Sequence, residues 1–216
     1  MKNTVFYLVR HGESLGNKNN RFLGHTDWDL SEKGYEQAYL TAKVLADVHF
    51  DYIYSSDLIR AYNTAVPHAK MRGMDIVTSK ELREIYAGYW EGFSREEIIE
   101  KWGEEFTYKW RREFGTYTIP GGESVQGASD RFLNECKRIA NMHPGKTILV
   151  TAHAAVIRSF WAKISKVDPV DYAEKVPFPS NASYSIAEFD GHEFLPISYS
   201  NDEHMGDLYT TVVYEK

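Results

Sequence analysis

The sequence has little cysteine and no long apolar run among its 216 residues. Its one cysteine, Cys136, rules out an internal disulfide framework and is typical of proteins from a reducing compartment. The apolar stretches fall short of the ~18 residues that a membrane-spanning helix requires. The N-terminal apolar run is too short for a signal peptide and is broken by Arg10. These absences predict a soluble, cytoplasmic protein without a membrane partner.

Basic residues are fewer than acidic ones, 25 against 31, which gives a formal net charge of −6 at pH 7. An acidic chain argues against a general binder of nucleic acid or of anionic membranes. Any site for an anion must therefore be built from a few cations placed close together. The length suits one domain with a sizeable core, with room for a modest insertion.

What the sequence does contain is an alternation of short apolar runs and helical periodicities. Buried strands are expected at residues 5–9, 53–55, 76–77 and 147–151, with late strands around 185–189, 195–199 and 210–214. Helices are expected from an N-cap at Ser31 to about Val48, at 58–65, at 124–142 and after His153. Pro67 should stop or kink the second of these helices. The alternation predicts an α/β fold, a three-layer sandwich whose mostly parallel central sheet is flanked by helices.

One segment in the middle of the chain departs from this alternation. Ser94 lies three residues before Glu97, which is the spacing of a capping box, so a short helix should begin there. From about residue 92 to residue 123 the chain is rich in aromatic and charged side chains. We interpret this segment as a helical cap inserted into a single domain that spans residues 1–216.

Two of the predicted strands end in a histidine, one in Arg10-His11-Gly12 and the other in His153. If these strands are parallel neighbours, both imidazoles lie at the same edge of the sheet, where α/β folds keep their sites. With Arg10 and Arg60 available, the pair indicates chemistry, although Arg10-His11-Gly12 alone also fits a strand end with surface side chains. A metal site is the competing hypothesis. Neither histidine has a second histidine or a carboxylate three or four residues on, as helical zinc sites do, so no metal or other cofactor is expected.

Several blocks of sequence follow one another in a recognisable order. They are Arg10 to Ser14 with Asn17, Arg21 to Gly24 with Asp27, Leu30 to Gly34, Ser56 to Ala61 with Thr64 and Ala65, Leu82 to Glu84, Gly88 to Gly92, Pro120 to Ser124, and Val150 to His153. Over residues 4–160 the chain thus resembles the histidine phosphatase superfamily, which includes cofactor-dependent phosphoglycerate mutases and related phosphatases. The resemblance implies the α/β fold and a reaction on phosphate esters.

The resemblance also implies roles for particular residues. His11 would take a phosphoryl group from a phosphomonoester, since an imidazole nitrogen is available near neutral pH and the N–P bond is labile to water. Glu84 would protonate the leaving oxygen and then help to activate water. The transferring oxygens would be held by Arg10, Arg60 and His153, with Asn17 as a neutral donor. Taken singly, Arg60 could be exposed on a helix, Glu84 a solvated carboxylate and Asn17 a turn residue.

The substrate pocket is expected to involve Asn17, Leu23, Gly24, Trp110, Arg111, Arg112 and Ala154. Mutases of this family carry a threonine, a tyrosine and an asparagine at the positions of Leu23, Ala87 and Ala155, so this chain lacks hydrogen bonds that a glycerate needs. Ala154 replaces the glycine that the family usually has after the second histidine. Trp110-Arg111-Arg112 resembles the mutase segment that grips substrate, and a solvated basic turn anchored by one tryptophan is the alternative.

These observations favour a phosphomonoesterase that hydrolyses a small phosphorylated metabolite through a phosphohistidine, a phosphoric monoester hydrolase of the histidine acid phosphatase type. Two alternatives stay open. One is a cofactor-dependent phosphoglycerate mutase, and the other is a catalytically weak regulatory protein that binds a phosphorylated ligand. The sequence leaves the physiological substrate and the oligomeric state open.

Overall fold

A computed structural model describes residues 2–211, apart from the side chain of Phe106. These residues form one six-stranded sheet with the order β3-β2-β4-β1-β5-β6. Its strands are β1 (Thr4–Arg10), β2 (Tyr52–Ser56), β3 (Ile76–Ser79), β4 (Thr147–Ala152), β5 (Tyr184–Phe189) and β6 (Phe194–Asn201). The first four are parallel to one another, β5 is antiparallel to β1, and β6 is antiparallel to β5. The expectation of a mostly parallel sheet is confirmed.

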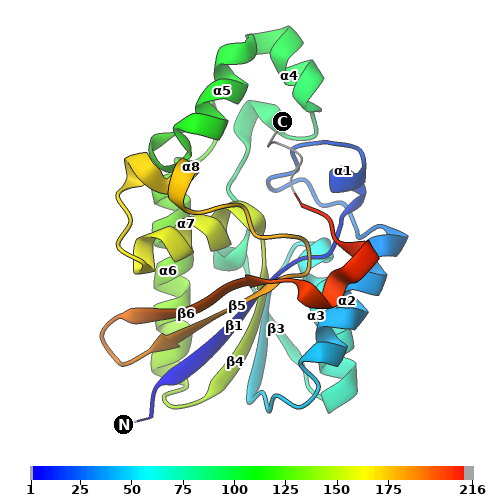
Figure 1. Ribbon diagram of the computed structural model, residues 1–216, viewed down its shortest axis with the longest axis vertical. Helices are drawn as coiled ribbons and strands as arrows, with labels where there is room; N and C mark the ends of the chain where they lie inside the picture. The colour runs from blue at the N-terminus through cyan, green and yellow to red at the C-terminus, as the bar shows by residue number, and fades with distance from the viewer. Residues whose placement is uncertain (1, 212–216) are drawn as a thin grey trace.

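Helices cover both faces of the sheet, as Figure 1 shows. The α-helices are α1 (Leu15–Lys18), α2 (Glu32–Val44), α3 (Ile59–Arg72), α4 (Arg95–Trp102), α5 (Glu104–Arg112), α6 (Val125–Met142), α7 (Ala154–Ile164) and α8 (Tyr172–Lys175). Single 3-10 turns occur at Lys80–Leu82, Gly88–Trp90, Phe114–Thr116, Pro169–Asp171 and Glu203–Leu208. Helices α2 and α3 lie on one face and α6 and α7 on the other, while α4 and α5 stand beyond the carboxyl ends of the parallel strands (Figure 1). The three-layer α/β prediction is therefore confirmed.

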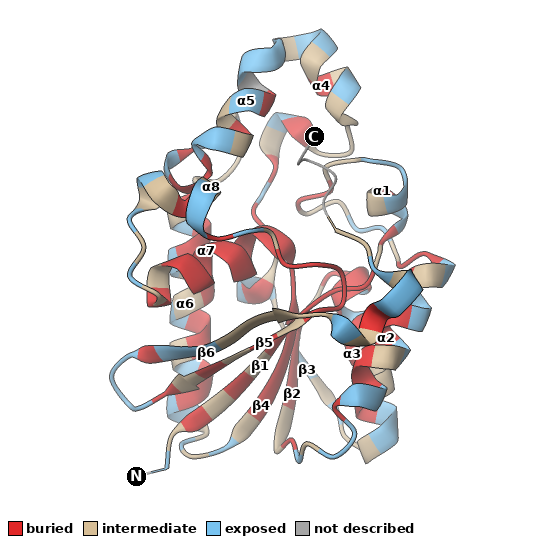
Figure 2. Ribbon diagram, in the orientation of Figure 1, coloured by how far each residue is buried: buried red, intermediate tan, exposed pale blue. Residues whose placement is uncertain are grey.

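The central strands are buried along most of their length (Figure 2). Because successive side chains of a strand point to opposite faces, Leu8 packs in the core under α6 and α7, and Val9 packs in the smaller core under α2 and α3. Both side chains are fully buried, which explains why β1 reads as a continuous apolar run. A strand buried on both faces fixes the position of whatever follows it.

The prediction that this helix ends before Pro67 is wrong, because α3 continues past Pro67. The helix continues to Arg72 and is closed by Gly73, whose backbone is left-handed. The missing N–H of Pro67 removes one helical hydrogen bond, but the face beyond it still buries His68 and Ala69. Burial of that face offsets the lost bond.

Other element boundaries also differ from the prediction. Ser31 caps α2 by accepting from the Gly34 N–H, as expected, but the helix ends at Val44 and not near Val48. Of the late strands, two are present as β5 and β6. In the third predicted strand, 210–214, the first two residues are not in a strand and the rest lie outside the described residues.

Cys136 lies on the buried face of α6, as its spacing with apolar neighbours indicates. Burial raises the pKa of its thiol well above the ordinary value, which keeps the side chain protonated and unreactive. Within residues 2–211, no helix has the length and apolar character needed to cross a membrane.

Replacement of the core ring on α6 tests this packing. Phe132 is fully buried and meets Phe160 of α7 at a ring-centroid distance of 5.5 Å. We expect Phe132→Ala to lower the free energy of unfolding by about 3–5 kcal/mol in urea titrations, because it leaves a cavity between the helices. Asn134→Ala, an exposed site on the same helix, should change it by less than about 0.5 kcal/mol. Similar losses in the two variants would contradict the assignment of this interface to the core.

Candidate active site

The parallel pairing of β1 with β4 brings the two histidines together. Arg10 lies opposite Ala152, and the next residue on each strand is a histidine. The rings of His11 and His153 lie edge to face with centroids 5.2 Å apart. The expected meeting of both imidazoles at one sheet edge is therefore seen in the structure.

The His11 ring is held in one protonation state. Its Nδ1 lies 2.7 Å from the backbone oxygen of Gly12, and since a carbonyl only accepts, Nδ1 carries the proton. Burial, followed by the positive charges of Arg60 and Arg10, holds the pKa of His11 well below its ordinary value of 6.5. The ring is therefore neutral at neutral pH, and Nε2 keeps its lone pair.

The turn after His11 requires glycine for steric reasons. A Cβ on Gly12 would lie 2.4 Å from the backbone oxygen of Gly34 at the start of α2. In return, a Cβ on Gly34 would lie 2.0 Å from the backbone oxygen of Glu13. This close backbone approach explains why glycine is needed at both positions, and it fixes α2 against the nucleophile turn.

The guanidinium groups of Arg10 and Arg60 are both buried at the same edge. Arg60 donates to the backbone oxygens of Gly24, at 2.7 Å, and Thr26, at 2.9 Å. Arg10 donates to the backbone oxygen of Pro179 at 2.7 Å. The two carbonyl partners of Arg60 orient its guanidinium without neutralising it, and although burial lowers the pKa of Arg60 to about 10, the group stays charged at neutral pH.

Glu84 lies half-buried at the start of α7 and lines the same pocket. Its carboxylate accepts from the backbone N–H groups of Ala155, at 3.1 Å, and Val156, at 3.2 Å. A third N–H, that of Ile85, donates at 2.9 Å. These three backbone donors fix the position of the Glu84 carboxyl group at the pocket, so it is not a fully solvated side chain.

The backbone that carries Glu84 is held by two arginines. Arg83 donates twice to Asp57, at 2.6 Å for each bond. Arg131 of α6 donates to the backbone oxygens of Arg83, at 3.0 Å, and Glu84, at 3.1 Å. Neither arginine lines the pocket, so their contribution is to fix the loop.

Asn17 both caps a turn and faces the pocket. Its Oδ1 accepts from the Ser14 N–H at 3.1 Å and from the Ser14 hydroxyl at 3.0 Å. Asn181 donates to the same oxygen at 3.3 Å. With the oxygen engaged by three donors, the Asn17 amide nitrogen is the atom left to donate into the pocket.

Asn181 was not predicted from the sequence. Its Nδ2 also donates to the backbone oxygen of His11 at 3.2 Å, as does the N–H of Ala182, again at 3.2 Å. Both residues belong to the segment 177–183, which precedes β5 and also supplies Pro179 to Arg10. The polar pair Ser180-Asn181 shortly before the predicted strand at 185–189 was the available signal. The antiparallel pairing of β5 with β1, which brings the start of β5 to the end of β1, was not predicted.

His153 lies away from the pocket surface, and Ala154 differs from the family pattern. His153 is fully buried beside His11 and is not among the lining residues, and its ring nitrogens have no hydrogen-bond partner within residues 2–211. Burial, then Arg60 and His11, lower the pKa of His153 well below its ordinary value. Ala154 begins α7 without a positive φ, so the backbone there does not require glycine.

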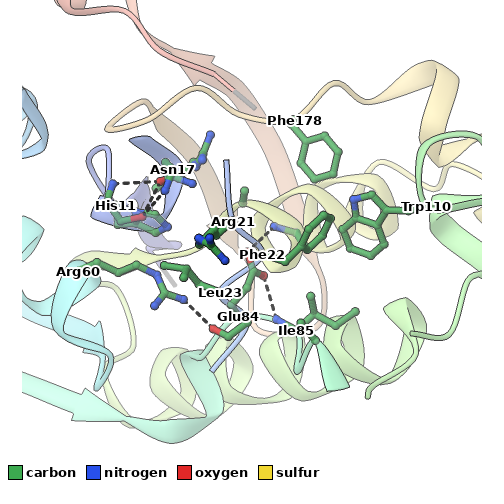
Figure 3. Close-up of a pocket in the computed structure, with 16 residues that line it drawn as sticks. His11, Asn17, Arg21, Phe22, Leu23, Arg60, Glu84, Ile85, Trp110 and Phe178 are labelled. Carbon is green, nitrogen blue, oxygen red and sulfur yellow. Dashed lines mark hydrogen bonds between the residues drawn. The ribbon is translucent and has the colours of Figure 1, made fainter. Parts of the chain in front are cut away.

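The pocket encloses about 570 Å³, including the part open to solvent (Figure 3). Its polar end is formed by Arg10, His11, Ser14, Asn17, Arg60 and Glu84. The predicted residues Leu23, Gly24, Trp110 and Ala154 also line it, together with Ala87 and Ala155. Arg111 and Arg112 do not, because they line a neighbouring hollow together with Arg158 and Glu174.

A neutral imidazole beside buried guanidinium groups and a positioned carboxylate forms a site suited to phosphoryl transfer. The chain belongs to the histidine phosphatase superfamily, because the sequence profile of its branch 1 matches residues 6–202. The predicted family is thereby confirmed.

Individual relatives include both hydrolases and mutases. Phosphoserine phosphatase 1 of Hydrogenobacter thermophilus is 32% identical over 202 residues, which cover 94% of each chain. A 2,3-bisphosphoglycerate-dependent phosphoglycerate mutase of Methanococcus vannielii is 33% identical over 198 residues, covering 78% of this chain and 83% of the mutase. The structure of a mycobacterial glucosyl-3-phosphoglycerate phosphatase with VO3 has a TM-score of 0.84 and 26% identity, covering 92% of this chain and 99% of that one. Phosphatases of small phosphorylated metabolites among these relatives agree with the predicted phosphatase activity.

Buried histidines make stability depend on pH. The pKa values of His11 and His153 are well below 6.5, and that of His68 on α3 is lowered to about 3, chiefly by burial. The unfolded chain therefore binds more protons below pH 6.5, so the free energy of unfolding should fall as the pH drops, by up to about 1.4 kcal/mol per pH unit for each histidine. We expect His68→Leu to reduce the dependence of the free energy of unfolding on pH, measured by urea titrations between pH 5 and 6.5. The reduction should correspond to about one fewer proton taken up on unfolding. An unchanged slope would contradict the buried neutral state of His68.

The contacts of Asn181 predict a role in phosphate binding. Asn181→Asp replaces a donor by a charged acceptor facing Asn17 Oδ1 and the His11 oxygen, so it repels the Asn17 oxygen and works against the two Ser14 donors that orient the amide. We expect the inhibition constant of vanadate, a phosphate mimic, to rise about tenfold. In an Asn17→Ala background the same change should have little further effect. The control is Asn201→Asp, whose amide donates to Tyr184 and Ser198 and does not line the pocket. Equal losses with and without Asn17 would argue against the role.

Proposed function

We propose that the protein is a phosphomonoesterase that hydrolyses a small phosphorylated metabolite through a phosphohistidine at His11 Nε2. The observation that carries the proposal is the bond from Nδ1 to the Gly12 oxygen, which leaves Nε2 as the nucleophilic atom. The buried guanidinium groups of Arg10 and Arg60 lie at the same edge and supply positive charge for the phosphoryl oxygens.

The reaction proceeds in two displacements. In the first, Glu84 takes a proton from the bound monoanionic ester, Nε2 forms a bond to phosphorus, the bond from phosphorus to the ester oxygen breaks, and Glu84 passes that proton to the leaving alcohol. In the second, water attacks phosphorus, Glu84 takes the water proton, and the N–P bond breaks to release inorganic phosphate and neutral His11. Asn17 and His153 assist by donating to the phosphoryl oxygens, in the case of His153 once the ligand or a ring motion brings the two into contact.

The pocket lining favours hydrolysis over mutase chemistry. A mutase must hold the intermediate of its small acid while keeping water out, which requires polar groups around the substrate. Leu23, Ala87 and Ala155 line the pocket and offer no side-chain hydrogen bond. The mutase alternative keeps one point in its favour, because mutases at 33% identity are among the relatives. A purely regulatory binder is the weaker alternative, since the nucleophile, the arginines, the second histidine and the acid are all present.

The proposal extends to the organisation of the chain. Residues 1–216 would act as one catalytic domain of the histidine acid phosphatase type, with residues 92–123 as its cap. The position of α4 and α5 beyond the carboxyl ends of the parallel strands (Figure 1) and the place of Trp110 of α5 in the pocket lining support the cap. The buried, protonated Cys136 is compatible with the cytoplasm as its location.

Removal of the nucleophile tests the mechanism. We expect His11→Ala to lower kcat on an aryl phosphate by ~1000-fold or more and to abolish the acid-labile phosphoenzyme trapped by rapid quenching. The exposed His49→Ala is the matched control and should keep full turnover. Chelation with EDTA should leave the rate unchanged, whereas a dependence on divalent cations would count against the mechanism. Rapid interconversion of 2- and 3-phosphoglycerate with little phosphate released would instead favour the mutase alternative.

A further inference from the structure

The half of the pocket away from His11 has a different chemistry from the polar end. Its wall includes Phe22, Trp110 and Phe178. The pocket lining also contains Leu23, Ile85 and Ala155, which are apolar as well. In Figure 3 the rings of Phe22, Trp110 and Phe178 lie on the side of the pocket away from His11 and Arg60. An apolar wall stabilises an apolar ligand group by removing it from water, and it gives a polar group no compensation for lost hydration.

The charge in this half is already neutralised. Arg21 is the cation found there among the described lining residues, and it forms an ion pair with Glu97 at 2.9 Å. The same Nη1 atom donates to the backbone oxygen of Gly92 at 2.7 Å. A substrate carboxylate would therefore have to compete with Glu97 for its counter-ion, which disfavours acidic alcohols.

Trp110 supplies one polar atom to this apolar wall. Its side chain is nearly fully buried and lines the pocket, and its Nε1–H has no hydrogen-bond partner within residues 2–211. Figure 3 shows the nitrogen on the pocket side of the ring, between Phe22 and Phe178. Buried indole N–H groups normally have an acceptor, so this donor lacks the partner that a bound ligand would provide.

The orientation of this donor is fixed by aromatic packing. Trp110 meets Phe114 edge to face at 5.0 Å, Phe22 edge to face at 5.7 Å, and Phe178 at 6.3 Å between centroids. A ring held from several sides cannot turn its N–H toward bulk water without breaking these contacts. The donor is thus pre-organised for a ligand atom, which reduces the entropy lost on binding.

We propose that the substrates of this enzyme are phosphate monoesters of apolar alcohols, cyclic or branched, that carry an uncharged hydrogen-bond acceptor for the Trp110 N–H. The proposal rests on the proposed phosphomonoesterase function and adds the class of alcohol to it. The phosphate lies at the polar end, the apolar body lies against Phe22 and Phe178, and the acceptor, a carbonyl or ether oxygen, meets Nε1. Small acidic esters such as O-phosphoserine lack both the apolar body and the uncharged acceptor for Nε1.

The test uses three substrates and follows released phosphate. 4-Acetylbenzyl phosphate carries the acceptor, 4-isopropylbenzyl phosphate has nearly the same shape without it, and O-phosphoserine is small and charged. For the unmodified protein we expect kcat/KM to be about five- to tenfold higher for the acetyl than for the isopropyl ester. The kcat/KM of both benzyl esters should exceed that of O-phosphoserine. A preference for O-phosphoserine, or equal rates for the two benzyl esters, would overturn the proposal.

Trp110→Phe separates the donor from the shape of the pocket. This variant keeps an aromatic ring and removes the N–H, so the advantage of the acetyl ester should vanish through a higher KM, with kcat unchanged. The isopropyl ester should lose less than about twofold. The control is Trp102→Phe, which makes the same change on α4 at a ring that packs on Phe93 outside the pocket and should keep the advantage. An acetyl advantage that survives Trp110→Phe would also overturn the proposal.

Different outcomes would contradict the phosphomonoesterase function and the assignment of the alcohol. If none of the three esters yields phosphate although the protein is folded by circular dichroism, the phosphomonoesterase function itself is wrong. If O-phosphoserine is hydrolysed with the highest kcat/KM, that function stands and only the assignment of the alcohol is wrong.

Discussion

The parallel pairing of β1 with β4 is the constraint on which the site depends. The ladder continues one residue beyond β1, since the His11 N–H donates to the Ala152 oxygen at 2.9 Å. The nucleophile is therefore held by the sheet itself and not by a mobile loop. Every other member of the site is placed relative to this edge: Arg60 by α3, which follows the adjacent β2, and Glu84 by the N-terminus of α7, which follows β4. A sheet edge of this kind combines rigid support with open access.

Burial at this edge makes the imidazole of His11 neutral but leaves the guanidinium of Arg60 charged. Removing an imidazole from water lowers a pKa that is already close to neutral, so His11 becomes a neutral nucleophile. Burial also lowers the pKa of Arg60, but from a much higher ordinary value to about 10, so the guanidinium stays charged. One physical cause thus produces both an uncharged base and a fixed cation within an acidic chain, and carbonyl oxygens provide the orientation.

Local and long-range features differed in how far the sequence could predict them. The strand ends with His11 and His153 were predictable because each histidine closely follows an apolar run in the sequence. The partners of Glu84 were not, because the bond to Ala155 joins residues 71 positions apart and depends on how the loop enters the sheet edge. Arg111 and Arg112 were expected at the pocket with Trp110, but on a helix consecutive side chains point in different directions, so the packing of α5 decides which one faces inward. The run of α3 through Pro67 likewise reflects tertiary burial that outweighs a local preference.

The segment 177–183 couples the wall of the pocket to the nucleophile turn, which limits how the pocket can be redesigned. It supplies Phe178 to the pocket wall, the Pro179 oxygen to Arg10, and the Asn181 amide to the backbone of the nucleophile. Variation that reshapes the wall here is tied to the chemistry, because a shift of the backbone would move the groups that hold Arg10 and His11. Trp110 of α5 packs beside Phe178 in the same wall, and among the described residues α5 makes no such bonds to the nucleophile turn. A substitution at Trp110 can therefore reshape the pocket for other alcohols without moving the nucleophile turn, whereas a substitution that shifts the backbone at Phe178 also moves the groups that hold Arg10 and His11.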